Sequence, residues 1–222
     1  MDKQAIYDDI RQQIVDERLK PGEWLVERDL CGTYGISRTP IREVLWQLTV
    51  EGLLVREANR GYTVRKLGLE QIFELFQARE AIEGMAARLA CRKGNETFRD
   101  NLRSIREELT KVDVEGDVYQ AILLGRKLHK AIDETAGNSI MAEISQKLQN
   151  LTILTINLTR KSPTIETISR NAHIAIIDAF LEQDEDKCER AMRDHLKDTC
   201  REVVEHFYPG MINARLPKRE TA

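Results

Sequence analysis

The sequence lacks any long hydrophobic run. Its apolar stretches are short and interrupted by charged residues, so no segment reaches the roughly 18 apolar residues that would span a bilayer. The N-terminus, MDKQAIYDDI, mixes acidic and basic residues and lacks the apolar core and small-residue cleavage site of a signal peptide. We therefore expect a cytoplasmic protein that does not associate with membranes.

Cysteine is scarce, and several catalytic motifs are missing. The four cysteines fit neither a disulfide framework nor a thiolate zinc site, because they lie far apart with no CxxC pair: Cys31, Cys91, Cys188 and Cys200. We expect reduced and mostly buried thiols. The sequence has no HExxH, no GxSxG and no phosphate-cradling glycine loop, and no carboxylate is obviously placed as a general base. We therefore expect that the protein is not an enzyme.

The composition is that of an ordinary globular protein. Hydrophobic residues make up 41% and charged residues 32% of the 222 residues, which provides enough apolar surface for a core and excludes intrinsic disorder. This length leaves room for one large or two small domains.

The first 66 residues predict a winged helix-turn-helix domain. Apolar residues at helical spacing in 4–19 indicate a helix that stops at Pro21-Gly22. A second helix runs from Leu25 to Gly35, and a third begins after Ser37 as N-cap and ends at Gly52. The runs LLVRE and YTVRK flank a turn and predict a hairpin that forms the wing.

From residue 69 to about 210 the pattern becomes entirely helical. Strand signals vanish, and apolar residues recur every three or four positions, which predicts about six antiparallel helices joined by short loops. The predicted breakpoints lie at Gly94-Asn95, Gly116, Gly137-Asn138, Ser162-Pro163 and Gln183-Asp184. The predicted fold is thus mainly α, with a domain at 1–66 followed by a helical bundle at 69–210.

The charge is unevenly distributed between these two parts. Although the whole chain carries −3, residues 37–66 contain six basic and three acidic residues and carry +3, so the remainder carries −6. A compact basic patch on an acidic protein suggests one face that binds an anionic polymer.

The stretch LKPGEWLVERDLCGTYGISRTPIREVLWQLTVEGLLVREANRGYTV, from Leu19 to Val64, resembles the winged helix-turn-helix of the GntR family of bacterial transcription regulators. The resemblance implies that the third helix enters the major groove and that the wing contacts the minor groove or the backbone. Arg38 and Arg42, four residues apart, could read guanine, and phosphates could be held by Arg28, Ser37 and Thr39. The implied DNA-contacting residues are Arg28, Ser37, Arg38, Thr39, Arg42, Asn59, Arg60 and Gly61.

This interpretation of the arginines has one alternative. They could form a solvated surface held by salt bridges, for example between Arg42 and the neighbourhood of Glu43. Trp46, Leu45 and Leu48 we expect to be core residues rather than DNA contacts.

The helical half, from about Leu69 to Tyr208, resembles the FCD-type ligand domain of the FadR-like branch of that family. The matching pieces are AREAIEGMAARLA, LHKAIDETAGNSIM and HIAIIDAFLEQDEDKCERAMRDHL. In many such domains an Asp, a His four residues later and two further His bind a divalent metal, and the corresponding positions here are Gly125, His129, His173 and His195. The resemblance therefore implies a three-histidine site for zinc, nickel, copper or iron that lacks the carboxylate.

Each histidine taken singly could instead be a hydrogen-bonded core residue, and without a metal the three imidazoles could hold an anion directly. Asp133 lies four residues after His129 and is a weak substitute for the missing Asp. Arg79 matches an arginine that points toward the ligand in relatives, which implies a small organic acid as effector, with a larger acyl ligand, as in some relatives, as the alternative. Its alternative is a salt bridge to Glu83.

Together these features predict a ligand-responsive transcription regulator, with repression relieved by the effector as the expected sign and activation as the alternative. Because two recognition helices multiply modest affinities, we expect a homodimer on a palindromic operator. Two rival functions are a metal-dependent enzyme that uses the three histidines and a DNA-binding dimer without an effector.

Overall fold

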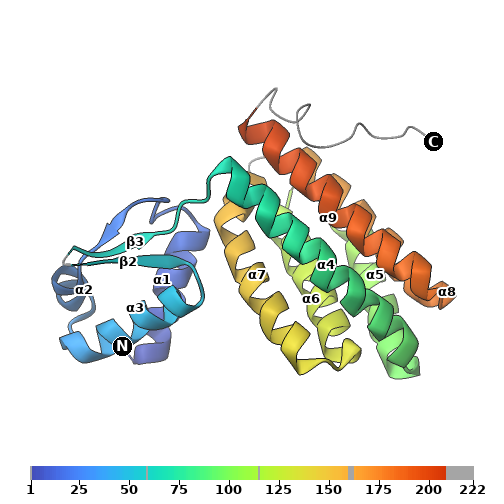
Figure 1. Cartoon of the computed structure of the whole chain (residues 1–222), viewed down its shortest axis with the longest axis horizontal. Coiled ribbons are helices and arrows are strands. Elements are labelled where there is room, and N and C mark those ends of the chain that lie inside the picture. Colours follow the sequence, from blue (N-terminus) through green and yellow to red (C-terminus); the bar gives the residue numbers. More distant parts are fainter. Residues whose placement is uncertain (1, 59, 115, 160–162, 209–222) are drawn as a thin grey trace. The chain divides into compact units, whose positions relative to one another are not determined.

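The computed structural model describes residues 2–58, 60–114, 116–159 and 163–208, and in them it contains nine helices and three short strands (Figure 1). The chain divides into two compact units. The first contains the chain up to Gly68 together with Gln149–Asn157, and the second contains Leu69–Leu148 and the chain from Leu158 onward. Among the described residues, no helix combines the length and the apolar character that a bilayer crossing requires.

The first unit is a three-helix domain with a small sheet. Its elements are α1 (Lys3–Val15), β1 (Trp24–Leu25), α2 (Glu27–Tyr34), α3 (Arg38–Val50), β2 (Leu54–Glu57) and β3 (Gly61–Val64). The turn between α2 and α3 is tight because Gly35 takes the left-handed conformation, with φ 66°, and donates its N–H to the carbonyl of Cys31. The helix-turn-helix predicted from the sequence is therefore confirmed.

Two local predictions in this unit were wrong. The first helix ends at Val15 rather than near residue 19, because Glu17 adopts a positive φ of 55°. Leu25, predicted to begin the second helix, lies instead in β1, which pairs with β3. A strand of two residues is too short to show an alternating pattern in the sequence. Ser37 occupies the N-cap position of α3, but its side chain makes no capping hydrogen bond.

The wing is an antiparallel sheet in the order β1-β3-β2. Val55 of β2 and Trp24 of β1 both face Thr63 of the central strand β3. Gly61 begins β3 with a φ of 111°, and a Cβ there would lie 3.1 Å from the carbonyl oxygen of Leu25. A glycine at this position therefore lets β1 approach β3 closely.

The core of the first unit includes residues from a distant helix. Ile10, Leu45 and Leu48 are fully buried at its centre, in agreement with the core predicted for α3. Ile153 and Leu154 belong to the same cluster, although the sequence placed them in the second domain. Periodicity identifies which face of a helix is apolar but not which core that face enters, which is why this division was missed.

The second unit is an all-helical bundle. Its helices are α4 (Leu69–Lys93), α5 (Glu96–Lys111), α6 (Val118–Ala136), α7 (Ser139–Thr159, in part), α8 (Pro163–Glu182) and α9 (Glu185–Phe207). They begin and end at the predicted breakpoints, of which Ser162 lies outside the described residues. Helices α4 and α9 pack along their length, and the small Gly84 admits the Arg193 side chain, which a Cβ would meet at 2.8 Å.

Gly61→Ala should destabilise the first unit by about 1–3 kcal/mol, because alanine would be strained at this φ and crowded by Leu25. Gly32→Ala is the matched control. Gly32 lies in α2 with nothing within 4 Å of a Cβ, so the same substitution should stabilise by about 0.5–1 kcal/mol. Both tryptophans, Trp24 and Trp46, lie in this unit, so denaturation followed by their fluorescence reports on it directly. Equal effects of the two substitutions would contradict the strained geometry at Gly61.

Candidate DNA-binding face and metal centre

The N-terminal end of α3 presents an exposed polar surface. Ser37, Arg38 and Thr39 are all exposed there. Within the described residues Arg38 forms no ion pair, so its guanidinium is available to a ligand. The free N–H groups of this first helical turn point in the same direction, which suits an anionic partner.

Arg42 differs from Arg38 because it is already paired. Its Nε donates to Oε2 of Glu27, at the start of α2, over 2.7 Å. The salt bridge expected as an alternative is therefore formed, but with Glu27. Glu43 instead accepts from Lys3 at 3.0 Å. Arg42 must leave Glu27, or use its remaining donors, to read a base.

The other predicted DNA contacts lie on α2 and on the wing. The Arg28 side chain is 81% exposed, with Asp29 at 3.4 Å. Arg60 is exposed at the wing turn beside Gly61, and Asn59 lies outside the described residues. Arg65, which contributes to the basic segment, donates from Nε to the carbonyl of Gly52 at 2.7 Å and is thus part of the framework.

Trp46 was predicted to be a core residue, and this was wrong. Its side chain is 55% exposed, whereas its neighbour Leu45 is fully buried. The cause is geometric: α3 packs one face against α1 and α2, and Trp46 follows Arg42 by one turn on the outer face. Hydrophobicity alone does not report which face a tryptophan occupies.

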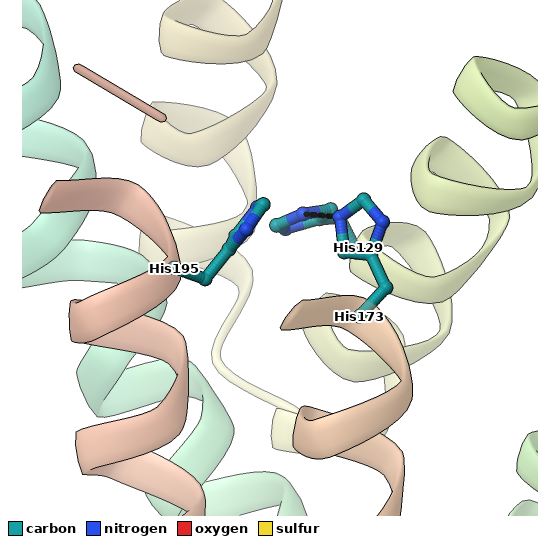
Figure 2. Close-up of side chains that lie close together, drawn as sticks. All are labelled: His129, His173 and His195. Atoms are coloured by element: carbon teal, nitrogen blue, oxygen red, sulfur yellow. Dashed lines mark hydrogen bonds between the residues drawn. The ribbon is translucent and has the colours of Figure 1, made fainter. Parts of the chain in front are cut away.

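In the second unit three helices bring three buried histidines together. His129 comes from α6, His173 from α8 and His195 from α9, and Figure 2 shows the three rings meeting between these helices. The ring centroids of His173 and His195 are 4.4 Å apart, and that of His129 lies 5.3 Å and 5.5 Å from them. The set predicted from the resemblance is thus assembled in space.

The hydrogen bonds of this histidine cluster are incomplete. Nε2 of His129 lies 3.3 Å from Nε2 of His173, so in the metal-free state one nitrogen must donate and the other accept. Nδ1 of His173 and Nδ1 of His195 are buried without a hydrogen-bond partner among the described residues. An unsatisfied buried polar atom costs about 1–3 kcal/mol, so the cluster is unfavourable unless something binds to it.

The arrangement fits a transition metal. One ligand atom from each of the three rings can be chosen so that all lie within 4.8 Å of one another. Two nitrogens bound to one zinc ion at about 2.0–2.1 Å with tetrahedral geometry are about 3.3 Å apart, which matches the His129–His173 separation. Imidazole is a ligand for zinc, nickel, copper and iron. The three histidines could therefore hold such an ion.

The carboxylate expected beside such a set is absent at residue 125. A Cβ on Gly125 would lie 2.5 Å from Cε1 of His173, so the His173 ring occupies the space that a side chain would need. Asp133, considered as a substitute, accepts a hydrogen bond from Ser145 of α7 at 2.7 Å and is not part of the ligand group. A contact four residues along a helix does not ensure convergence on one point.

Glu83 of α4 is the carboxylate that does reach the histidines. It is 1% exposed, and its Oε2 lies 2.7 Å from Nδ1 of His129, although the contact is too bent for a regular hydrogen bond. Oε1 accepts from Nε of Arg79 at 2.6 Å. The sequence indicated Glu83 only as a salt-bridge partner, since the spacing of residues 79 and 83 within α4 says nothing of α6.

Arg79 was expected to point toward an effector, and its salt-bridge alternative is what the structure contains. Nε and Nη2 both donate to Glu83, at 2.6 and 3.3 Å, and the guanidinium lies over the Phe76 ring, 5.3 Å from its centroid. Arg79 is buried, so its charge is felt at the histidines even though two of its nitrogens are occupied.

These surroundings determine the charge of the site. Burial lowers the pKa of His173 and of His195 well below 6.5, and the positive charge of Arg79 adds to the effect. Burial by itself raises the pKa of Glu83, but Arg79 and His129 outweigh it and lower the pKa to about 2. At neutral pH the site therefore combines two neutral imidazoles with an ionised carboxylate.

A winged helix-turn-helix joined to an all-helical domain is an architecture typical of DNA-binding transcription regulators. Residues 2–64 match the family model "Bacterial regulatory proteins, gntR family", and residues 74–198 match the FCD domain. The chain therefore belongs to the GntR family, in the group that carries an FCD domain, and is a transcriptional regulator. The family membership does not favour the alternative of a metal-dependent enzyme.

Relatives and solved structures agree with this assignment. The chain is 25% identical over 193 residues to the Nta operon transcriptional regulator of Aminobacter aminovorans, covering 86% of this chain and 89% of the relative. It is 27% identical over 206 residues to the HTH-type transcriptional repressor RspR of Escherichia coli, covering 90% and 88%. The structure of E. coli McbR/YncC has the same fold, with a TM-score of 0.78 at 22% identity, covering 92% of this chain and 98% of that one.

The metal-free protein should lose stability as the pH falls below about 6.5. Below that pH the unfolded chain binds protons at His173 and His195, while the folded chain does not. Each histidine therefore lowers the free energy of unfolding by about 1.4 kcal/mol for each pH unit. Denaturant unfolding of chelator-treated protein between pH 5 and about 7, followed by circular dichroism, measures this slope. The double variant His173→Gln/His195→Gln should flatten it, and an unchanged slope would assign the dependence to other groups.

Proposed function

We propose that the protein binds a palindromic operator as a homodimer and that a small organic acid, bound at a metal in the FCD domain, changes its operator affinity. The proposal for the effector domain is carried by the three buried histidines with their unsatisfied nitrogens. Repression relieved by the effector is the proposed sign. Two relatives support it by name, RspR and the probable D-xylose utilization operon transcriptional repressor of Paenarthrobacter nicotinovorans, which is 26% identical over 191 residues and covers 86% of this chain and 84% of the relative.

At the DNA end, the proposal assigns two kinds of contact. Arg38, exposed and without an ion pair among the described residues, reads a base edge from the start of α3, with Arg42 joining it after release from Glu27. Phosphates are contacted by Arg28, Ser37 and Thr39, and the wing contributes Asn59, Arg60 and Gly61. Two protomers then place two α3 helices in successive turns of the major groove.

At the effector end, the charges favour an anion. Gly125 contributes no ligand, and Arg79 is neutralised by Glu83, so a divalent ion held by three neutral imidazoles would keep its full charge. A carboxylate that coordinates the ion balances this charge. Arg79 does not offer a free guanidinium fork to this carboxylate, because its Nε and Nη2 already donate to Glu83.

The link between the two ends is thermodynamic. An effector that binds one arrangement of the dimer better than another shifts the population toward it, and the operator responds in proportion to that difference in affinity. A DNA-binding dimer without an effector remains the rival, and it predicts an operator affinity that no small molecule changes.

Arg38→Ala should weaken the free energy of operator binding by about 1–3 kcal/mol and relax the sequence preference, because a bidentate base contact is lost. Arg28→Ala should weaken binding evenly on all sequences, because a phosphate contact carries no sequence information. Titrations of operator and scrambled duplexes at one fixed salt concentration measure both. If Arg38→Ala weakened the two duplexes equally, its role in reading bases would be wrong.

Tag-free purified protein should contain about one divalent transition-metal ion per chain, and His173→Ala should remove it by deleting one of three ligands. Elemental analysis of both proteins gives the answer. His206→Ala is the control, since His206 lies outside the predicted ligand set. Metal absent from wild type would redirect the effector search to anions held by the imidazoles and Arg79 alone.

A further inference from the structure

We propose that Glu83 is the positioning carboxylate of the histidine cluster. It holds the Nδ1 edge of His129 so that Nε2 faces the shared ligand position, and it brings to the cluster, from α4, the carboxylate that residue 125 does not provide. The inference rests on the proposed metal site and adds to it the group that makes three neutral ligands sufficient.

The first support is the isolation of Glu83 from water. At 1% exposure an ionised carboxylate is unfavourable unless its oxygens are paired. Oε1 is satisfied by Nε of Arg79 at 2.6 Å, and Oε2 faces Nη2 of Arg79 at 3.3 Å and Nδ1 of His129 at 2.7 Å. The carboxylate therefore connects Arg79, its ion-pair partner on α4, with His129 on α6.

The second support is the protonation state that this contact selects. An ionised carboxylate only accepts hydrogen bonds, so the ring nitrogen nearest to it, Nδ1 of His129, carries the proton. Nε2 then keeps its lone pair, and it is this atom that faces His173 at 3.3 Å. A carboxylate behind a histidine fixes the ring and raises its basicity as a metal ligand.

The third support is the lack of a competing carboxylate in the described part of the chain. The group there that could share an ion consists of the three histidines alone. Gly125 has no side chain, and the space beside it is filled by His173. Asp133 is committed to Ser145. Glu83 is thus the acidic side chain in contact with a ligand of the set.

Glu83 could also act by a second route, because it neutralises Arg79. A bare guanidinium beside the histidines would repel a divalent ion. The double variant Arg79→Met/Glu83→Gln separates the two routes, since it removes both charges together. If Glu83 acts by positioning His129, the double variant keeps the weakened metal affinity of Glu83→Gln. If Glu83 acts by neutralising Arg79, the double variant recovers the wild-type metal affinity.

The experiment uses the full chain, stripped with a chelator and titrated with Co²⁺ and Zn²⁺ against a competing indicator. Glu83→Gln should weaken the affinity 10–100-fold, the range seen when a carboxylate behind a histidine ligand is removed, and should change the visible spectrum of bound Co²⁺. Glu80→Gln is the matched control. Glu80 lies three residues earlier on α4, and its ion pairs are with Arg193 and Lys197, at 3.5 and 3.3 Å, rather than with a histidine. It should leave both the affinity and the spectrum unchanged.

Each other outcome overturns the inference in a distinguishable way. Wild-type affinity and spectrum in Glu83→Gln would remove the role of Glu83 while leaving the metal site intact. Recovery in the double variant would replace positioning by charge neutralisation. Failure of wild type to bind either ion would remove the metal site and the inference together. Should Glu83→Gln fail to fold, Glu83→Asp keeps the charge but shortens the reach to His129, and unchanged Co²⁺ binding in that variant would overturn the positioning role.

Discussion

The second unit is organised around a charged group that cannot reach water. The Arg79–Glu83 pair and the three histidines are buried in the interior of the bundle, where most of the other buried side chains are apolar. Burial makes each of these polar atoms costly unless it has a partner. Helices α4, α6, α8 and α9 must therefore keep one mutual arrangement, since a shift of any of them would separate a charge from its partner or a histidine from the cluster. The polar interior thus fixes the bundle more narrowly than its apolar contacts could.

The two units place their charged residues in different environments. In the first, arginines at the start of α3 and on the wing stay near the surface, where water screens them and a polyanion can replace it. Arg42 shows an intermediate case, because its exposed side chain is already paired with Glu27. In the second unit Arg79 is enclosed and its partner comes from its own helix, so it shapes the electric field of a site without leaving it.

The sequence was most informative at residue types that few local conformations favour, such as glycine in a left-handed turn or in a loop between helices. Gly35 predicted the left-handed turn of the helix-turn-helix, and Gly94, Gly137 and Gln183 marked loops between the helices as they occur. The three histidines were selected through the resemblance to the FCD-type domain, because three of the four histidines in the chain fall on its ligand positions. Contacts between distant elements were beyond reach: the pairing of Arg42 with Glu27, the exposure of Trp46 and the approach of Glu83 to His129 all depend on which helix faces which. Periodicity carries no information about that choice.

Helix α7 begins in one compact unit, and its Gln149–Asn157 segment belongs to the other. Ile153 and Leu154 fill part of the core that also contains Ile10 and Leu48. A fragment cut after residue 68 to isolate the DNA-binding domain would leave that core open, with an apolar surface where these side chains had been. Such a fragment would be less stable than the same residues in the intact chain and would tend to self-associate. Dissection of this regulator by truncation would therefore measure a damaged domain, and substitutions in the intact chain are the sounder route.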